Sequence, residues 1–262
     1  MKRTLCFAIA LAAPAWASDG RLEISAACVA AGCFPGDAPG FPVQTAAGQS
    51  YVLTSKLSVP DANTNAIQLA SNASLDLGGF SIEGVTSCSA SPTTCTSTGS
   101  GVGVSGAGGS SVRNGRVAKM GDDGIRGASM IVENVVVEQN GGHGISGGGG
   151  ASGWLIHHCR IQLNGDDGIN LNVGGGADGS LIEHNVIRRN GGYGVIGIEM
   201  RVADNAVVAN DSYGLAFNTG GGVESGFVGN YLIDNNGGNA NPQIGGGISL
   251  GPNVCGTDTT CP

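Results

Sequence analysis

The sequence is poor in charged and aromatic residues, which make up only 12% and 5% of its 262 residues. So few aromatic side chains exclude the thick core of a conventional globular domain. The 49 glycines would indicate disorder if the apolar residues were scattered, but those residues recur in short, regular segments. Past residue 17 there is no run of about eighteen apolar residues, which argues against a membrane-inserted protein.

Basic residues are also scarce. Two of them, Lys2 and Arg3, open a segment with a short apolar stretch and a small-residue end, which predicts a signal peptide over residues 1–17. The rest of the chain carries ten basic residues against twenty acidic ones. This balance argues against a nucleic-acid partner and, with the leader, favours a secreted or periplasmic protein. It would also repel an acidic polysaccharide unless calcium bridges the two.

Seven cysteines follow the leader, and six of them form close pairs: Cys28 with Cys33, Cys88 with Cys95, and Cys255 with Cys261. In an oxidising compartment we expect three small disulfide loops. Cys159 is left over. We expect it to be a buried, apolar side chain rather than a reactive thiol, because no basic cluster lies near it in the sequence.

One unit recurs from about residue 111 to 250. Its first aliphatic residue is Val112, Val132, Ile156, Ile182, Val202 and Val228. Its second is Val117, Val137, Ile161, Ile187, Val207 and Ile233. Three residues later comes an asparagine, at Asn140, Asn164, Asn190, Asn210 and Asn236. A glycine-rich turn then leads to the third aliphatic residue, at Ile125, Ile145, Ile169, Val195, Leu215 and Ile248.

Three short apolar segments per unit, without a helical period, are buried only if each unit stacks on the last. The prediction is an all-β fold, a single-stranded parallel β-helix with three parallel sheets and asparagine ladders in its turns. We expect a cap over residues 18–60, the β-helix over 61–250 and a disulfide-closed tail over 251–262. The stretch from Cys88 to Ser110 is predicted to be a loop that leaves an early coil.

The unit, which ends N-G-x-x-G-I, resembles the repeat of right-handed parallel β-helix proteins in the pectin-lyase-like superfamily. The resemblance covers about two thirds of the chain after the leader and implies a right-handed solenoid. That superfamily includes pectate lyases, polygalacturonases, uronan epimerases and phage tailspikes, so the resemblance points to a polysaccharide partner without fixing a reaction.

With the coils in register, the residue two places before each third aliphatic residue forms a column: Asp123, His143, Asp167, Tyr193 and Tyr213. Successive members should lie about 4.8 Å apart at the backbone. Because aliphatic residues fill the interior, we expect these side chains to point outward. The glycine-rich insertions at 146–153, 172–180 and 218–225 are expected to border a groove beside them.

The stretch G-D-D-G-I-R, followed twenty residues later by G-G-H-G-I-S, is similar to motifs of polygalacturonase-type glycoside hydrolases. This likeness implies Asp122 and Asp123 as acid and base, with His143 in support. The residues themselves offer a second pair, Asp123 and Asp167, about 9.6 Å apart at the backbone, at the wide limit for an inverting glycosidase. The full candidate set is catalytic Asp122, Asp123, His143, Asp166 and Asp167, and substrate-binding Arg126, Asn170, Tyr193 and Tyr213.

Three functions stay open. The first is binding or cleavage of a polysaccharide. The second is a non-catalytic scaffold or adhesion protein, in which Asp-Asp-Gly is turn chemistry alone. The third is a uronan lyase or epimerase, with Arg126 as base or carboxylate clamp. No cofactor is expected, although calcium at the paired aspartates stays open. His158, His184 and Asp204 match zinc ligands by type, but such turn positions take any polar residue.

Overall fold

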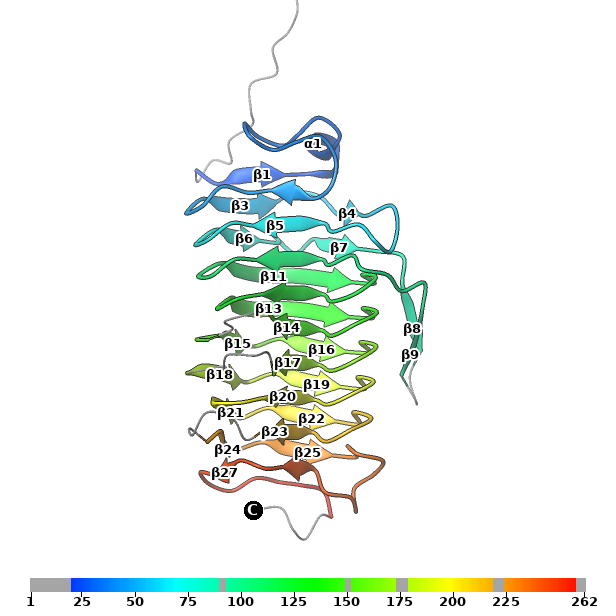
Figure 1. Cartoon of the computed structure of the whole chain (residues 1–262), viewed down its shortest axis with the longest axis vertical. Coiled ribbons are helices and arrows are strands. Elements are labelled where there is room, and N and C mark those ends of the chain that lie inside the picture. The colour runs from blue at the N-terminus through cyan, green and yellow to red at the C-terminus, as the bar shows by residue number, and fades with distance from the viewer. Residues whose placement is uncertain (1–19, 90–92, 149–151, 173–178, 219–223, 258–262) are drawn as a thin grey trace, which may run out of the picture.

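A computed structural model describes residues 20–89, 93–148, 152–172, 179–218 and 224–257. Its strands stack coil upon coil into a column with the helix α1 (Ala26–Val29) at the N-terminal end (Figure 1). The pairings between successive coils are parallel, so the predicted parallel β-helix is confirmed. The predicted signal peptide, residues 1–17, lies outside the described residues.

Within the described residues each full coil supplies strands to three faces. A sixteen-stranded sheet has two arms joined by the long strands β11 (Ser111–Ala118) and β13 (Ile131–Glu138). The first arm also contains β1 (Leu22–Ile24), β3 (Ser50–Leu53), β6 (Ser74–Asp76), β15 (Leu155–His157), β18 (Ser180–Glu183), β21 (Met200–Ala203), β24 (Gly226–Val228) and β27 (Ile248–Ser249). The second arm also contains β4 (Leu57–Ser58), β7 (Ser81–Glu83), β16 (Arg160–Gln162), β19 (Val186–Arg188), β22 (Ala206–Val208) and β25 (Tyr231–Ile233).

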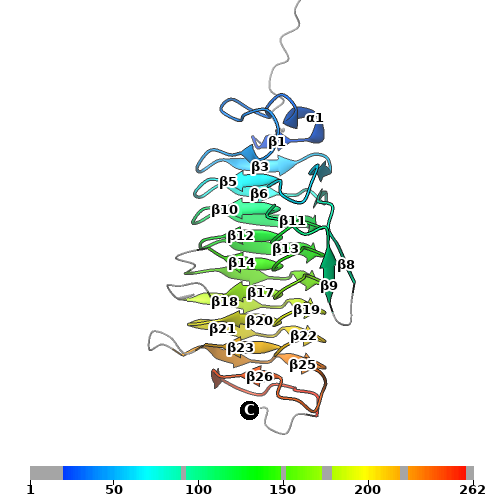
Figure 2. The same ribbon diagram turned by 45° about the vertical axis from the view of Figure 1, so that its right-hand side comes forward.

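The third face is a nine-stranded sheet (Figure 2). It contains β2 (Val43–Gln44), β5 (Ile67–Leu69), β10 (Val104–Gly106), β12 (Ile125–Gly127), β14 (Ile145–Gly147), β17 (Ile169–Leu171), β20 (Val195–Gly197), β23 (Leu215–Phe217) and β26 (Ile244–Gly245). The turn from the second arm into this sheet carries the candidate aspartates.

Three columns of aliphatic side chains fill the interior, as predicted. Val132, Ile161 and Ile169, one from each face, are fully buried. Each pairs with the corresponding residue of the next coil, for example Ile161 with Ile187. The apolar area removed from water on every coil stabilises the stack by about 25 cal/mol per Å².

The predicted landmarks of the last coil are wrong by one residue in the first two columns. Phe227 and Leu232, not Val228 and Ile233, pair with the landmark residues Val202 and Val207 of the preceding coil and are fully buried. In the third column Ile244, not Ile248, follows Leu215. Phe227 and Val228 are adjacent apolar residues, as are Leu232 and Ile233, so either member of each pair fits the sequence pattern and only strand pairing separates them.

Asparagine ladders lie in the turns, as predicted. The Nδ2 of Asn140 donates to Oδ1 of Asn164 (2.8 Å), and the pattern continues through Asn190 and Asn210. The next member is Asn235 rather than Asn236. A second ladder, at the turn between the two arms, runs through Asn185, Asn205, Asn230 and Asn253. The ladders satisfy buried amides, so each coil is tied to the next.

The region predicted as a cap contains α1 and four strands, and these strands already pair with the coils, for example β1 with β3. The Cys28–Cys33 disulfide joins α1 to the following turn. The proposed boundary at residue 61 stays a prediction.

The stretch after Cys88 is not a plain loop. Antiparallel strands β8 (Ser87–Ser89) and β9 (Thr94–Thr96), closed by the Cys88–Cys95 disulfide, form a hairpin that we call the strap. It lies alongside the stack (Figures 1 and 2). Thr93 donates its N–H to Asp211 (3.0 Å) and its hydroxyl to the carbonyl of Arg189 (2.9 Å). The strap therefore contacts coils that lie far along the chain.

Cys255 is also disulfide-bonded, and its predicted partner, Cys261, lies outside the described residues. Cys159 is a free, buried cysteine. Burial raises its pKa to about 12, which confirms a buried thiol rather than a reactive one. Among the described residues no helix is long and apolar enough to cross a membrane.

Candidate functional site

The predicted turn column assembles. The backbone N–H of His143 donates to Oδ1 of Asp123 (2.8 Å), and that of Tyr193 donates to Oδ1 of Asp167 (2.7 Å). Between them, the N–H of Asp167 donates to Nδ1 of His143 (3.2 Å). Each of these three side chains thus caps the turn of the next coil. These contacts are structural in kind, and they fix the positions of Asp123, His143 and Asp167.

Asp123 does not point into solvent, contrary to expectation. It is 1% exposed, because its carboxylate accepts hydrogen bonds from Arg126 Nε (2.8 Å) and from the hydroxyl of Ser146. The same guanidinium reaches Asp122, with Nη2 2.7 Å from Oδ2. Arg126 therefore lies over both aspartates. Asp122 is the more accessible carboxylate of the pair, with a side chain that is 30% exposed.

His143 and Asp167 make a second set of contacts in the next two coils. Nδ1 of His143 lies 3.3 Å from Oδ2 of Asp167, and the Asn170 amide donates to the same carboxylate oxygen (2.7 Å). Nδ1 accepts the backbone N–H of Asp167 only in the neutral imidazole, whereas a protonated Nδ1 donates to Oδ2. The two contacts therefore exclude each other: the first needs a bare Nδ1, and the second needs a proton on Nδ1, in the imidazolium or in the Nδ1–H tautomer.

The electrostatics of this set are shifted from ordinary values. Burial alone would lower the pKa of His143, but its hydrogen bond to Asp167 and the charges of Asp123, Asp167 and Asp166 outweigh burial and raise it. Partial loss of water raises the pKa of Asp166. The charge of His143 opposes this increase, and the charge of Asp167 adds to it. Groups with shifted pKa values gather at functional sites more often than elsewhere.

Tyr193 and Tyr213 are neighbours with parallel rings. The interplanar angle is 6° and the centroids lie 6.3 Å apart. A methyl group built on Gly245 would lie 3.7–3.8 Å from three ring carbons of Tyr213, so that ring lies over the Gly245 backbone. Gly245 therefore covers one face of the Tyr213 ring.

A second row of side chains lies beside the turn column, on the outer face of the nine-stranded sheet. We call it the outer column, and strand pairing aligns its members: Gln68, Ser105, Arg126, Ser146, Asn170, Ile196 and Ala216. Arg126 and Asn170 were predicted from the sequence as site residues, whereas Gln68, Ser105 and Ser146 were not. Each of these three polar residues directly follows a buried aliphatic residue of the third column, as Arg126 and Asn170 do, and this position could have identified them as outward-facing.

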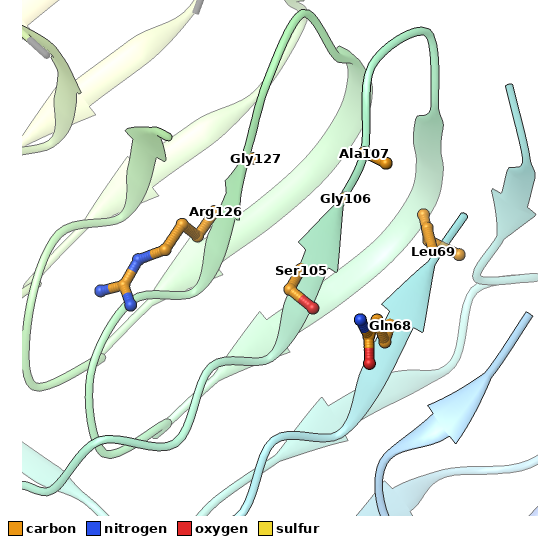
Figure 3. Close-up of a pocket in the computed structure, with 7 residues that line it drawn as sticks. All are labelled: Gln68, Leu69, Ser105, Gly106, Ala107, Arg126 and Gly127. Carbon is orange, nitrogen blue, oxygen red and sulfur yellow. The ribbon is translucent and has the colours of Figure 1, made fainter. Parts of the chain in front are cut away.

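A shallow pocket of about 270 Å³ lies at the N-terminal end of the outer column. It is lined by Gln68, Leu69, Ser105, Gly106, Ala107, Arg126 and Gly127 (Figure 3). The pocket adjoins the turn column because Arg126, which lines the pocket, donates to Asp123 of that column. The two columns and this pocket together form one continuous face, which is polar along the outer column from Gln68 to Asn170.

A family model described as the right-handed β-helix region matches residues 46–196 and 100–252. The chain belongs to this right-handed β-helix family. Among curated proteins, none matches it significantly in sequence.

The right-handed β-helix is similar to solved structures of the periplasmic alginate epimerase AlgG. The epimerase itself has a TM-score of 0.51 at 12% identity, with 79% of this chain and 59% of that chain covered. A double mutant of the same epimerase gives 0.53 at 13% identity, with 81% and 60% covered. At such identity the similarity establishes the fold alone. This chain spans about 60% of the epimerase's length.

The turn between the two arms of this β-helix does not assemble the zinc set that its residue types resemble. His158 and His184 stack with centroids 5.3 Å apart, and His158 also meets His157, with their Nδ1 atoms 2.9 Å apart. Across the described residues no group of three or more His, Cys, Asp or Glu side chains converges on a metal position. For calcium, the oxygens of Asp122 and Asp123 that face each other across Arg126 are already occupied by the guanidinium.

Proposed function

We propose that this protein is exported and binds a linear polysaccharide along the turn column and outer column. The observation that supports this is the register of the face. Each coil contributes one polar side chain to the outer column from Ser105 to Asn170, and one to the turn column from Asp123 to Asp167, at one strand spacing. A face that repeats in this way suits a polymer that also repeats. The two disulfides and the predicted leader support export to an oxidising compartment.

We further propose glycosidic-bond cleavage as the reaction of this site, with Asp166 as general acid and Asp122 as general base. Both are more accessible than Asp123 and Asp167, and the raised pKa of Asp166 suits an acid. They stand two coils apart, about 9.6 Å at the backbone, near the separation of inverting glycosidases. Gly142 lies between them, where a methyl group would come within 2.5 Å of Asp122 Oδ1, so this coil leaves the gap open.

The test is incubation with neutral and acidic polysaccharides, followed by measurement of new reducing ends. Asp166→Asn and Asp122→Asn are expected to abolish activity, and His143→Gln to reduce it. Asp234→Asn is the matched control, because Asp234 is exposed, lies outside the face, and has a positive φ that asparagine tolerates. Activity that survives both aspartate variants would refute the assignment.

A non-catalytic scaffold is the second candidate. The observation that favours it is the capping of successive turns by Asp123 and Asp167, which gives both carboxylates a structural role. This alternative predicts neither turnover nor glycan binding.

A uronan lyase or epimerase is the third candidate, which the fold shared with an alginate epimerase suggests. The same incubations test it, because a lyase produces unsaturated uronates that absorb light and an epimerase changes the C5 configuration seen by NMR.

A further inference from the structure

The pocket at the end of the outer column carries no free positive charge. The guanidinium of Arg126 donates from Nε to Asp123 (2.8 Å) and from Nη2 to Asp122 (2.7 Å). In Figure 3 it points away from Ser105 and Gln68, so the stem of the side chain lines the pocket while the charge lies outside it. Two carboxylates therefore compensate the guanidinium of Arg126, the one arginine among the described residues that line the pocket.

The polar groups that remain in the pocket are neutral. Gln68 is exposed, and its amide makes no hydrogen bond with the residues that the structure describes. The Ser105 hydroxyl makes only a long contact, 3.5 Å, to the carbonyl of Ile67. An amide and a hydroxyl supply both donors and acceptors, which is what the hydroxyl groups of a sugar require. Leu69 and Ala107 add apolar surface beside them.

We propose that this pocket binds an uncharged sugar unit and makes the face selective for neutral polysaccharides over uronans. The proposal rests on the proposed function, since it names the substrate class of the same face. A uronate carboxylate placed here would lose water without gaining a free cation. It would also approach four carboxylates against a single arginine: Asp123 and Asp167 of the turn column, and Asp122 and Asp166 directly before them in the sequence.

The test compares polymers that differ only in charge. Three uronans, polygalacturonate, polymannuronate and polyglucuronate, are each paired with the neutral polymer made by reducing its carboxyl groups. We expect the wild-type protein to bind at least one neutral polymer about tenfold more tightly than its parent uronan at low salt, with the difference shrinking as salt screens the charges. Equal or tighter binding of the uronans would overturn the inference and leave the proposed function standing.

Variants locate the effect. Gln68→Ala and Ser105→Ala are expected to weaken binding of the neutral polymer about fivefold each, as loss of one hydrogen bond allows. Asp122→Asn frees one arm of Arg126 and is expected to tighten uronan binding. Glu133→Gln is the control for charge, because it removes the same charge from the first arm.

The two proposals fail separately. If none of the six polymers binds, both the selectivity and the proposed function are refuted. If neutral polymers bind best but Gln68→Ala and Ser105→Ala leave their affinity unchanged, the pocket is the wrong place, and this inference alone is refuted.

Discussion

The backbone N–H of His143 donates to the carboxylate of Asp123, one coil earlier in the stack, at 2.8 Å. The other carboxylate oxygen accepts hydrogen bonds from Arg126 and Ser146. A single buried aspartate therefore joins a turn, a strand and the next coil. This relationship explains why the first Asp-Asp-Gly turn is both a structural element and part of the candidate site.

Asp123 should be important for stability, whatever the site does. Asp123→Ala leaves the N–H of His143 and the Ser146 hydroxyl without an acceptor, and we expect a loss of about 2 to 4 kcal/mol in the free energy of unfolding. Asp123→Asn keeps one acceptor oxygen and should lose less. Urea unfolding measures both. Asp122→Ala, at a half-exposed position, is the control, and an equal loss there would contradict the structural role of Asp123.

The asparagine ladder should be equally sensitive. In Asn164→Ala, the Nδ2 of Asn140 loses its acceptor and Oδ1 of Asn190 loses a donor, and both atoms are buried. We expect a loss of about 1 to 3 kcal/mol in the free energy of unfolding. Asn172→Ala, at an exposed position, should change it by less than about 0.5 kcal/mol. Similar effects of the two substitutions in urea unfolding would contradict the importance of the ladder.

Stability should fall as pH rises above about 6.5, because the fold raises the pKa of His143 above its ordinary value near 6.5. The contribution of this histidine is complete below about pH 6.5 and is lost as pH rises through the folded pKa. The raised pKa of Asp166 also makes stability fall as pH rises, starting at a lower pH than the effect of His143. The carboxyls with lowered pKa values, such as Glu83 and Glu138, lose their contributions only toward acid pH.

Urea unfolding at several pH values checks this dependence. His143→Gln should remove the fall above about pH 6.5, since glutamine does not titrate. The ¹⁵N shifts of the imidazole give a second readout, because Nδ1 changes from acceptor to donor on protonation. A wild-type protein that is more stable at pH 8.5 than at pH 6 would show that the sign is wrong.

Close approach of the coils at the glycine turns gives a further prediction. A methyl group at Gly165 would lie 2.2 Å from the carbonyl oxygen of Gly141 and 3.0 Å from the sulfur of Cys95. Gly165→Ala should therefore push both the neighbouring coil and the strap outward and cost about 2 kcal/mol or more. At Gly108 the nearest atom would be 3.9 Å away, so Gly108→Ala should be neutral or slightly stabilising. Equal melting temperatures for the two variants would contradict this packing.

The strand-turn repeat was predictable from the sequence because each coil places its aliphatic residues at nearly the same spacing between asparagine and glycine turns. Val112 and Val132, for example, occupy the same position of the repeat and pair in the structure. The alignment failed at the last coil, where Phe227 and Val228 are adjacent apolar residues and only hydrogen bonding between strands selects Phe227.

The sequence by itself thus determined the architecture and the identity of the residues that share a column, since register follows from periodic spacing. Only the tertiary structure decided which of those side chains meet water. Asp122 and Asp123 are identical letters in one turn, yet one is half-exposed and the other is buried beneath Arg126 and Ser146. Accessibility depends on which groups from neighbouring coils cover a side chain, and that information is not contained in the local pattern.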